Sequence, residues 1–148
     1  MNRQEDLLQQ ITRIARSSHG FFVDVYPGVT DAEVRTAFAY ISEVKGRLLQ
    51  DLAPWMPPAA TSTDPTDHIS PATVVEKMYA DARRNFRGAT PAASAGALSV
   101  GEEQLLRLLE RAFAGSSTSI LKNLLKSYYP QLVICREAMS RLHARLAA

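Results

Sequence analysis

The chain has 148 residues, of which 46% are hydrophobic and 22% are charged, a balance typical of a water-soluble globular domain. Its apolar runs are shorter than the roughly 18 residues that a membrane-spanning helix needs. Its polar N-terminus is not followed by the apolar region of a signal peptide. The single cysteine, Cys135, cannot form an internal disulfide. These features predict one cytoplasmic domain over residues 1–148, without membrane association.

The net charge of +2 is unevenly distributed along the chain. Residues 104–148 contain seven basic and two acidic residues. A basic stripe of this kind can bind nucleic acid. Spaced cations without a regular interleaved pattern of aromatic or glycine residues are more typical of the solvated face of an amphipathic helix, which makes nucleic-acid binding the weaker interpretation. The basic residues are Arg107, Arg111, Lys122, Lys126, Arg136, Arg141 and Arg145.

The first predicted helix covers residues 4–26. Its apolar residues recur at helical spacing, and Ser18 occupies the one polar position of the stripe. Gly20 weakens the helix, and the adjoining Phe21-Phe22-Val23 also fits a short strand, so both structures remain open there. Pro27-Gly28 ends the segment. The stripe consists of Leu7, Ile11, Ile14, Phe21 and Val25.

A second helix is predicted to begin at Thr30-Asp31-Ala32-Glu33. This sequence reads as a capping box, in which the Thr30 hydroxyl and the Glu33 carboxylate each accept from a free backbone amide. Lys45 falls at a position of the apolar stripe, and we expect its ammonium group to extend outward to solvent. The other stripe residues are Val34, Phe38, Ile41, Leu48 and Leu52.

Residues 54–70 form a predicted internal linker, because four prolines among Ser, Thr and Asp cannot sustain a helix interior. Its length favours a crossover over a tight hairpin. Trp55 and Met56, two large apolar residues at its start, are expected to fold back onto one end of the domain.

Three further helices are predicted after the linker. The third begins at Ser70-Pro71, an N-cap followed by proline at the first helical position. The fourth covers residues 93–114, although a possible capping box over residues 99–102 allows a later start. The fifth covers residues 117–146, and Pro130 is expected to kink it without ending it. This order predicts an all-α, ferritin-like antiparallel four-helix bundle, with two helix pairs joined by the crossover and a short extra helix.

Metal ligands are sparse where such a bundle would need them. Di-metal bundles use Glu from two helices and Glu-x-x-His from the other two. No glutamate of this chain is followed by histidine three residues later, and His19, His68 and His143 are scattered. We therefore expect a dry core without a metal or another cofactor. The alternative is an iron or manganese site with atypical carboxylate ligands, drawn from Glu43, Glu102, Glu103 and Glu137.

Nucleophilic catalysis is also not indicated. Cys135 falls on the apolar stripe of the fifth helix, where a cysteine is usually an inert small hydrophobe. The chain contains no phosphate-binding loop, nucleophile elbow or dinucleotide fingerprint. No catalytic residues are therefore predicted.

Several short segments resemble a family of uncharacterised bacterial ferritin-like four-helix-bundle proteins. The resemblance implies the bundle fold described above. Family members carry more acidic residues in the first helix and often a His-Asp pair in the last. Here Val23, Tyr26 and Met139-Ser140 fall near those places, which implies a metal-free member. The segments that carry the resemblance are Gly20-Phe21, Val29-Thr30-Asp31-Ala32-Glu33-Val34 followed by Phe38, Gly101-Glu102-Glu103, and the run that begins at Gln131.

Three functions are considered from this pattern. The first is a non-enzymatic bundle that acts through its surface, as a homodimer or with a protein partner, using the Trp55-Met56 region or the basic last helix. The second is the metal-binding bundle with atypical ligands. Nucleic-acid binding through residues 104–148 is the third and weakest.

Overall fold

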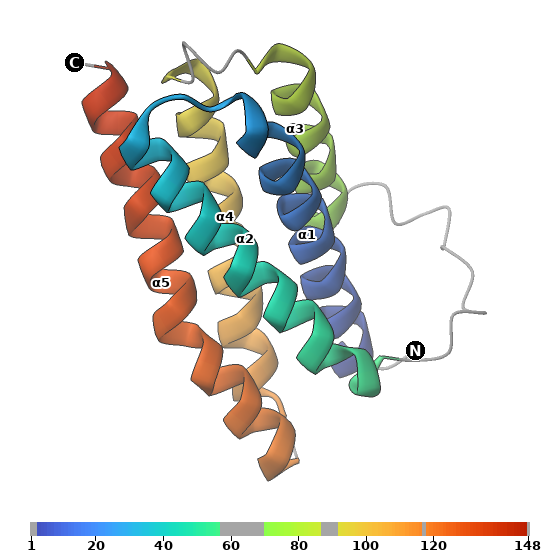
Figure 1. Cartoon of the computed structure of the whole chain (residues 1–148). Coiled ribbons are helices and arrows are strands. Elements are labelled where there is room, and N and C mark those ends of the chain that lie inside the picture. The colour runs from blue at the N-terminus through green and yellow to red at the C-terminus, as the bar shows by residue number, and fades with distance from the viewer. Residues whose placement is uncertain (1–2, 57–69, 87–91, 117, 148) are drawn as a thin grey trace.

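The computed structural model describes residues 3–56, 70–86, 92–116 and 118–147, and in these ranges the protein is all-helical, as predicted. Figure 1 shows its five α-helices. Short 3-10 turns follow the first two helices, at Tyr26–Gly28 and Ala53–Trp55. The α-helices are α1 (Arg3–Val25), α2 (Ala32–Leu52), α3 (Pro71–Asn85), α4 (Ala92–Ala114) and α5 (Ser119–Ala147).

The helices form two antiparallel pairs, α1 with α2 and α4 with α5 (Figure 1). The pairs meet where α1 contacts α4 and where α2 contacts α5, so the four long helices enclose a common interior. The shorter α3 lies along the outside of α1 and α4. Among the described helices, none is both long and apolar enough to cross a membrane.

The structure corrects three local predictions. The α1 helix continues through Gly20 to Val25, so the strand interpretation of residues 21–23 is wrong. Phe21 and Phe22 are both fully buried, and helix geometry places them on the core side. The N-cap of α2 is Asp31 and not Thr30, because the Asp31 carboxylate accepts from the backbone N–H of Val34. Finally, α4 begins at Ala92, so the later start is wrong.

Other local predictions are confirmed. Ser70 caps α3, accepting from the backbone N–H of Thr73, and proline follows at the first helical position. The α5 helix continues through Pro130. Trp55 and Met56 are half-buried and contact the core, as expected. Most of the predicted linker, residues 57–69, lies outside the described residues.

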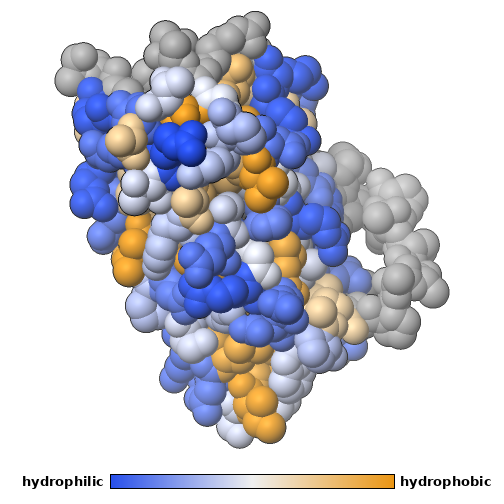
Figure 2. Space-filling view, in the orientation of Figure 1, coloured by the Kyte–Doolittle hydropathy of each residue, from blue (hydrophilic) through white to orange (hydrophobic). Residues whose placement is uncertain are grey.

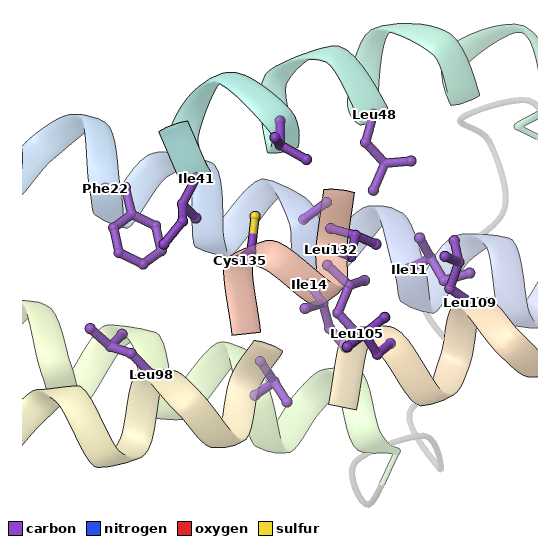
Figure 3. Packing of buried hydrophobic residues seen from close by; sticks show 14 of the residues in the cluster. Ile11, Ile14, Phe22, Ile41, Leu48, Leu98, Leu105, Leu109, Leu132 and Cys135 are labelled. Carbon is purple, nitrogen blue, oxygen red and sulfur yellow. The ribbon is translucent and has the colours of Figure 1, made fainter. Parts of the chain in front are cut away.

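The core is continuous along the bundle, and its labelled side chains point into the space between the helices (Figure 3). Aromatic rings concentrate where the C-terminal half of α1 meets the start of α2 and the end of α3. The Phe22 and Phe38 ring centroids are 4.8 Å apart, and those of Phe21 and Phe86 are 6.0 Å apart. Edge-to-face aromatic pairs of this kind contribute beyond the area that they bury.

The C-terminal end of α5 is tied to the N-terminus of α2 by ion pairs. The Arg145 guanidinium lies 3.0 Å from the Asp31 carboxylate and 3.4 Å from that of Glu33. The hydrogen bond from the backbone of Val34, followed by that from Arg145, lowers the pKa of Asp31 below its ordinary value of 3.8. Ionised Asp31 therefore stabilises the folded state by capping α2 and by pairing with Arg145.

Replacing Asp31 with asparagine keeps a capping oxygen but removes the charge. Because the pKa of Asp31 is lower in the folded state, its charge stabilises the protein above pH 3.8, and this contribution is lost as pH falls through the folded-state pKa. We expect the wild type to be more stable than Asp31→Asn near neutral pH, and the two to converge in acid. Urea unfolding across this pH range measures the difference; two parallel stability curves would contradict the assignment.

Candidate functional site

Lys45 points into the bundle, so the prediction that it extends outward to solvent is wrong. Its side chain is 0% exposed, and its ammonium group lies 2.6 and 2.8 Å from the two carboxylate oxygens of Glu102. The same ammonium donates to the Ser18 hydroxyl at 2.9 Å. All three donors of the ammonium therefore have a partner, which offsets the large cost of burying a charge.

The three residues of this network are positioned by the apolar stripes of three helices. Ser18 lies between Ile14 and Phe21 on α1, and Lys45 lies between Ile41 and Leu48 on α2. Glu102 has the same placement on α4, four residues after Leu98 and three before Leu105. Leu98 and Leu105 are both buried, so helix periodicity turns the Glu102 carboxylate inward. The ion pair thus joins α2 and α4 across the interior.

The two remaining helices add a hydroxyl and a thiol to the same region. Tyr79 of α3 and Cys135 of α5 are buried, and the charge of Glu102 acts on both. We call Ser18, Lys45, Tyr79, Glu102 and Cys135 the interior polar cluster; each of the five helices contributes one member.

The Tyr79 side chain packs against Gly101 of α4. A Cβ atom added at Gly101 would lie 2.9 Å from the Tyr79 hydroxyl oxygen and 3.2 Å from the adjacent ring carbon. A side chain larger than hydrogen at position 101 would therefore displace the Tyr79 ring. The hydroxyl itself has no hydrogen-bond partner among the residues that the structure describes.

Burial makes both side chains poor proton donors. It raises the pKa of Tyr79 well above its ordinary value, and the negative charge of Glu102 raises it further. Burial also raises the pKa of the Cys135 thiol to about 12, which the Lys45 ammonium partly opposes. At neutral pH the cluster therefore holds one ion pair, a neutral phenol and a neutral thiol.

The proposed carboxylate ligands do not come together. Glu102 is committed to Lys45. Glu103 lies 3.0 Å from the Arg136 guanidinium, whose hydrogen bond lowers the pKa of Glu103. Glu43 and Glu137 are exposed. Within residues 3–56, 70–86, 92–116 and 118–147, no group of three or more His, Cys, Asp or Glu side chains is placed to hold a metal ion.

The two histidines within the described ranges, His19 and His143, each lie against a glycine of a neighbouring helix. The His19 imidazole of α1 faces α2, with its Nε2 atom 3.1 Å from a Cβ added at Gly46. The His143 imidazole of α5 covers Gly96 of α4 in the same way. Its Cε1 atom lies 3.1 Å from a Cβ atom added at Gly96. His68 lies outside the described residues. These two imidazoles therefore fill space beside a neighbouring helix.

The basic residues of the C-terminal third are partly neutralised within the chain. Arg136 and Arg107 both pair with Glu103, and Arg145 pairs with the start of α2. The Lys126 ammonium lies 6.0 Å from the centre of the Phe113 ring. The cations thus form intramolecular contacts along α4 and α5, as expected for a solvated helix face.

Comparison with known proteins finds no match to the chain among protein-family models, curated proteins or solved structures. The resemblance to ferritin-like bundles therefore stays a prediction.

Replacing Lys45 with methionine should destabilise the fold strongly, because it leaves the Glu102 carboxylate buried without its ammonium partner. Breaking a buried pair on one side costs about 3–5 kcal/mol. The matched control is Arg47→Met, since Arg47 is exposed on the same helix, and surface ion pairs contribute only ~0–1 kcal/mol. The free energy of unfolding in urea measures both effects.

The double variant Lys45→Met with Glu102→Leu tests whether the unpaired charge of Glu102 accounts for the stability lost in Lys45→Met. Removing both charges together leaves no uncompensated ion, so we expect the double variant to recover most of the stability lost in Lys45→Met. A double variant that is as unstable as the single variant would show that packing at position 45, and not the ion pair, accounts for the loss.

Cys135 should react slowly with thiol reagents in the folded protein. The thiolate is the reactive form, and a pKa of about 12 leaves almost none of it near neutral pH. We expect alkylation to be slow in buffer and complete in denaturant, as followed by intact-protein mass spectrometry. Equally fast reaction in both conditions would contradict the burial of this thiol.

Proposed function

We propose that this chain is a non-enzymatic, ferritin-like helical-bundle protein that acts through its surface, by association with a second copy of itself. The observation that carries this proposal is a stripe of exposed, uncharged residues on α5 between Ile120 and Ile134. The interior polar cluster also supports a function at the surface, because its ionic groups are paired with each other and closed to solvent.

The exposed face of α5 carries two isoleucines. Ile120 is 70% exposed and Ile134 is 48% exposed, which makes them the two large hydrophobic side chains that α5 presents to solvent. Asn123, Ser127 and Pro130 lie between them on the same side and are also exposed. We call these five residues the α5 outer stripe.

The α5 outer stripe is symmetric about its centre. Ile120 and Ile134 are each seven residues, or about two helical turns, from Ser127. Two α5 helices that cross in antiparallel orientation at Ser127 would place each Ile120 beside the Ile134 of the other copy. Such a self-complementary patch is what a two-fold dimer requires. The stripe thus supports a homodimer more specifically than a general interaction surface.

The alternative surface at Trp55-Met56 receives less support. Both side chains are half-buried against the core, and the Thr12 hydroxyl donates to the Met56 sulfur at 3.2 Å. The metal-binding alternative also loses support, because the Lys45 ammonium already occupies both oxygens of Glu102. Nucleic-acid binding is weakened by the ion pairs that Arg107, Arg136 and Arg145 form within the chain.

The dimer is tested by placing charge in the α5 outer stripe. We expect the wild type to have twice the monomer mass by light scattering at micromolar concentration, and Ile120→Glu or Ile134→Glu to have the monomer mass. Burying a charge without a partner at a packed interface is unfavourable, whereas the exposed side chain tolerates it in the monomer. Unchanged helical circular dichroism would show that the variants still fold.

Val74→Glu is the matched control, because Val74 is a comparably exposed apolar residue on a different helix, at 61%. This variant should retain the dimer mass. A wild type that is monomeric at all concentrations, or a Val74→Glu variant that dissociates as readily as Ile134→Glu, would rule out the α5 outer stripe as the interface.

A further inference from the structure

The contact between α2 and α5 is the least extensive of the contacts that close the four-helix interior. The two helices belong to different antiparallel pairs, and their mutual contact is smaller than that of α1 with α2 or of α4 with α5. On the opposite side, the contact between α1 and α4 is reinforced by α3, which packs against both. We call the line along which α2 faces α5 the α2–α5 seam; it lies towards the viewer in Figure 1.

Polar bridges connect the two helices along the outside of this seam. The Tyr128 hydroxyl donates to the Asp51 carboxylate, and the Arg47 guanidinium donates to the Gln131 side chain at 3.0 Å. At the far end, Arg145 pairs with Asp31. Figure 2 shows this face as largely hydrophilic, with separate hydrophobic patches. The Arg47–Gln131 contact is exposed, and such contacts contribute little to stability because water competes for the same groups. The Tyr128–Asp51 hydrogen bond is partly buried.

Members of the interior polar cluster lie directly behind the seam. Lys45 comes from α2 and Cys135 from α5, and both are fully buried. Tyr40 of α2 is half-buried beside them, and the pKa of its hydroxyl is raised by burial and by the neighbouring Cys135. Separating α2 from α5 would therefore uncover the thiol and the ammonium group together.

Hydration of the uncovered groups offsets part of the cost of opening at this place. Exposing apolar side chains to water is unfavourable throughout, but an ammonium, a carboxylate and a hydroxyl regain hydrogen bonds to water. The α2–α5 seam therefore combines a limited helix contact, an exposed bridge between Arg47 and Gln131, and a polar interior. Partial openings of folded proteins take place where such features coincide.

We propose that the α2–α5 seam is a gate, which opens while the rest of the bundle stays folded and gives solvent and small polar molecules access to the interior polar cluster. The gate is independent of self-association through the α5 outer stripe, so it can be tested in a monomeric variant such as Ile120→Glu.

Cys135, the single cysteine, reports opening of the gate in the full-length protein. The rate at which iodoacetamide alkylates Cys135 is measured without urea and at low urea concentrations. This rate is compared with the rate that global unfolding alone would allow. If the gate exists, labelling in the absence of urea is faster than global unfolding allows, and low urea concentrations accelerate it only weakly, because a local opening exposes little surface.

Weakening the bridges should open the gate more often. We expect Tyr128→Phe and Gln131→Ala to accelerate Cys135 labelling up to about fivefold, a factor equivalent to ~1 kcal/mol. The free energy of global unfolding should fall by the same small amount, because each bridge is absent from the open state and from the unfolded state alike. Gln131→Ala keeps the test valid if Tyr128→Phe fails to fold, since the Arg47–Gln131 bridge is exposed. Arg13→Ala is the control, because Arg13 bonds Glu76 of α3 on the other side of the bundle, at 2.6 Å; its labelling rate should equal that of the wild type.

Two results would overturn the gate. The first is Cys135 labelling that follows global unfolding, with the same urea dependence, in the wild type and in the bridge variants. The second is equal acceleration by Arg13→Ala and Gln131→Ala, which would show that Cys135 is uncovered by general loosening and not by the α2–α5 seam.

Discussion

The buried ion pair between Lys45 and Glu102 is the constraint on which the rest of this bundle depends. It connects α2 of one helix pair to α4 of the other, through an interior that is otherwise almost entirely apolar. Apolar side chains attract one another without strong directional preference, whereas an ammonium group must lie within hydrogen-bond distance of its acceptors. Shifting one helix pair along the other would leave both charges buried and unpaired. The ion pair therefore favours one register of the two pairs over its neighbours.

The surroundings of the ion pair follow from this requirement. Ser18 supplies the third acceptor for the Lys45 ammonium, and Gly101 leaves room for the Tyr79 ring beside Glu102. The Tyr79 ring centroid lies 5.8 Å from that of Phe21, so α3 is joined to the aromatic part of the core at the same place. One polar contact is thus surrounded by side chains from all five helices, which excludes water from it and strengthens its electrostatic attraction.

The same arrangement keeps the potentially reactive side chains away from the surface. The interior polar cluster contains groups that can act as nucleophiles or acids in other settings, but here the ionic groups are paired, and burial raises the pKa values of the phenol and the thiol. The outside of α5 offers the opposite combination, with exposed isoleucines and no charge between them on that face. The polar groups of the interior are thus closed to solvent, whereas the isoleucines of the α5 outer stripe are exposed to it.

The sequence by itself determined the helices, because apolar spacing, Ser70-Pro71 and the turn residues act within a few positions along the chain. It also contained a signal for the site that went unused: Ser18 and Lys45 occupy apolar-stripe positions, and Glu102 stands between Leu98 and Leu105. Only the tertiary structure decided that these polar residues face one another, since a lysine on a stripe can either reach solvent or bury its charge. That choice depends on whether a carboxylate lies opposite, and here Glu102 lies on a different helix, 57 residues away in the chain. Local spacing fixes the face on which a side chain lies, but only packing of the helix pairs supplies the partner that makes its burial favourable.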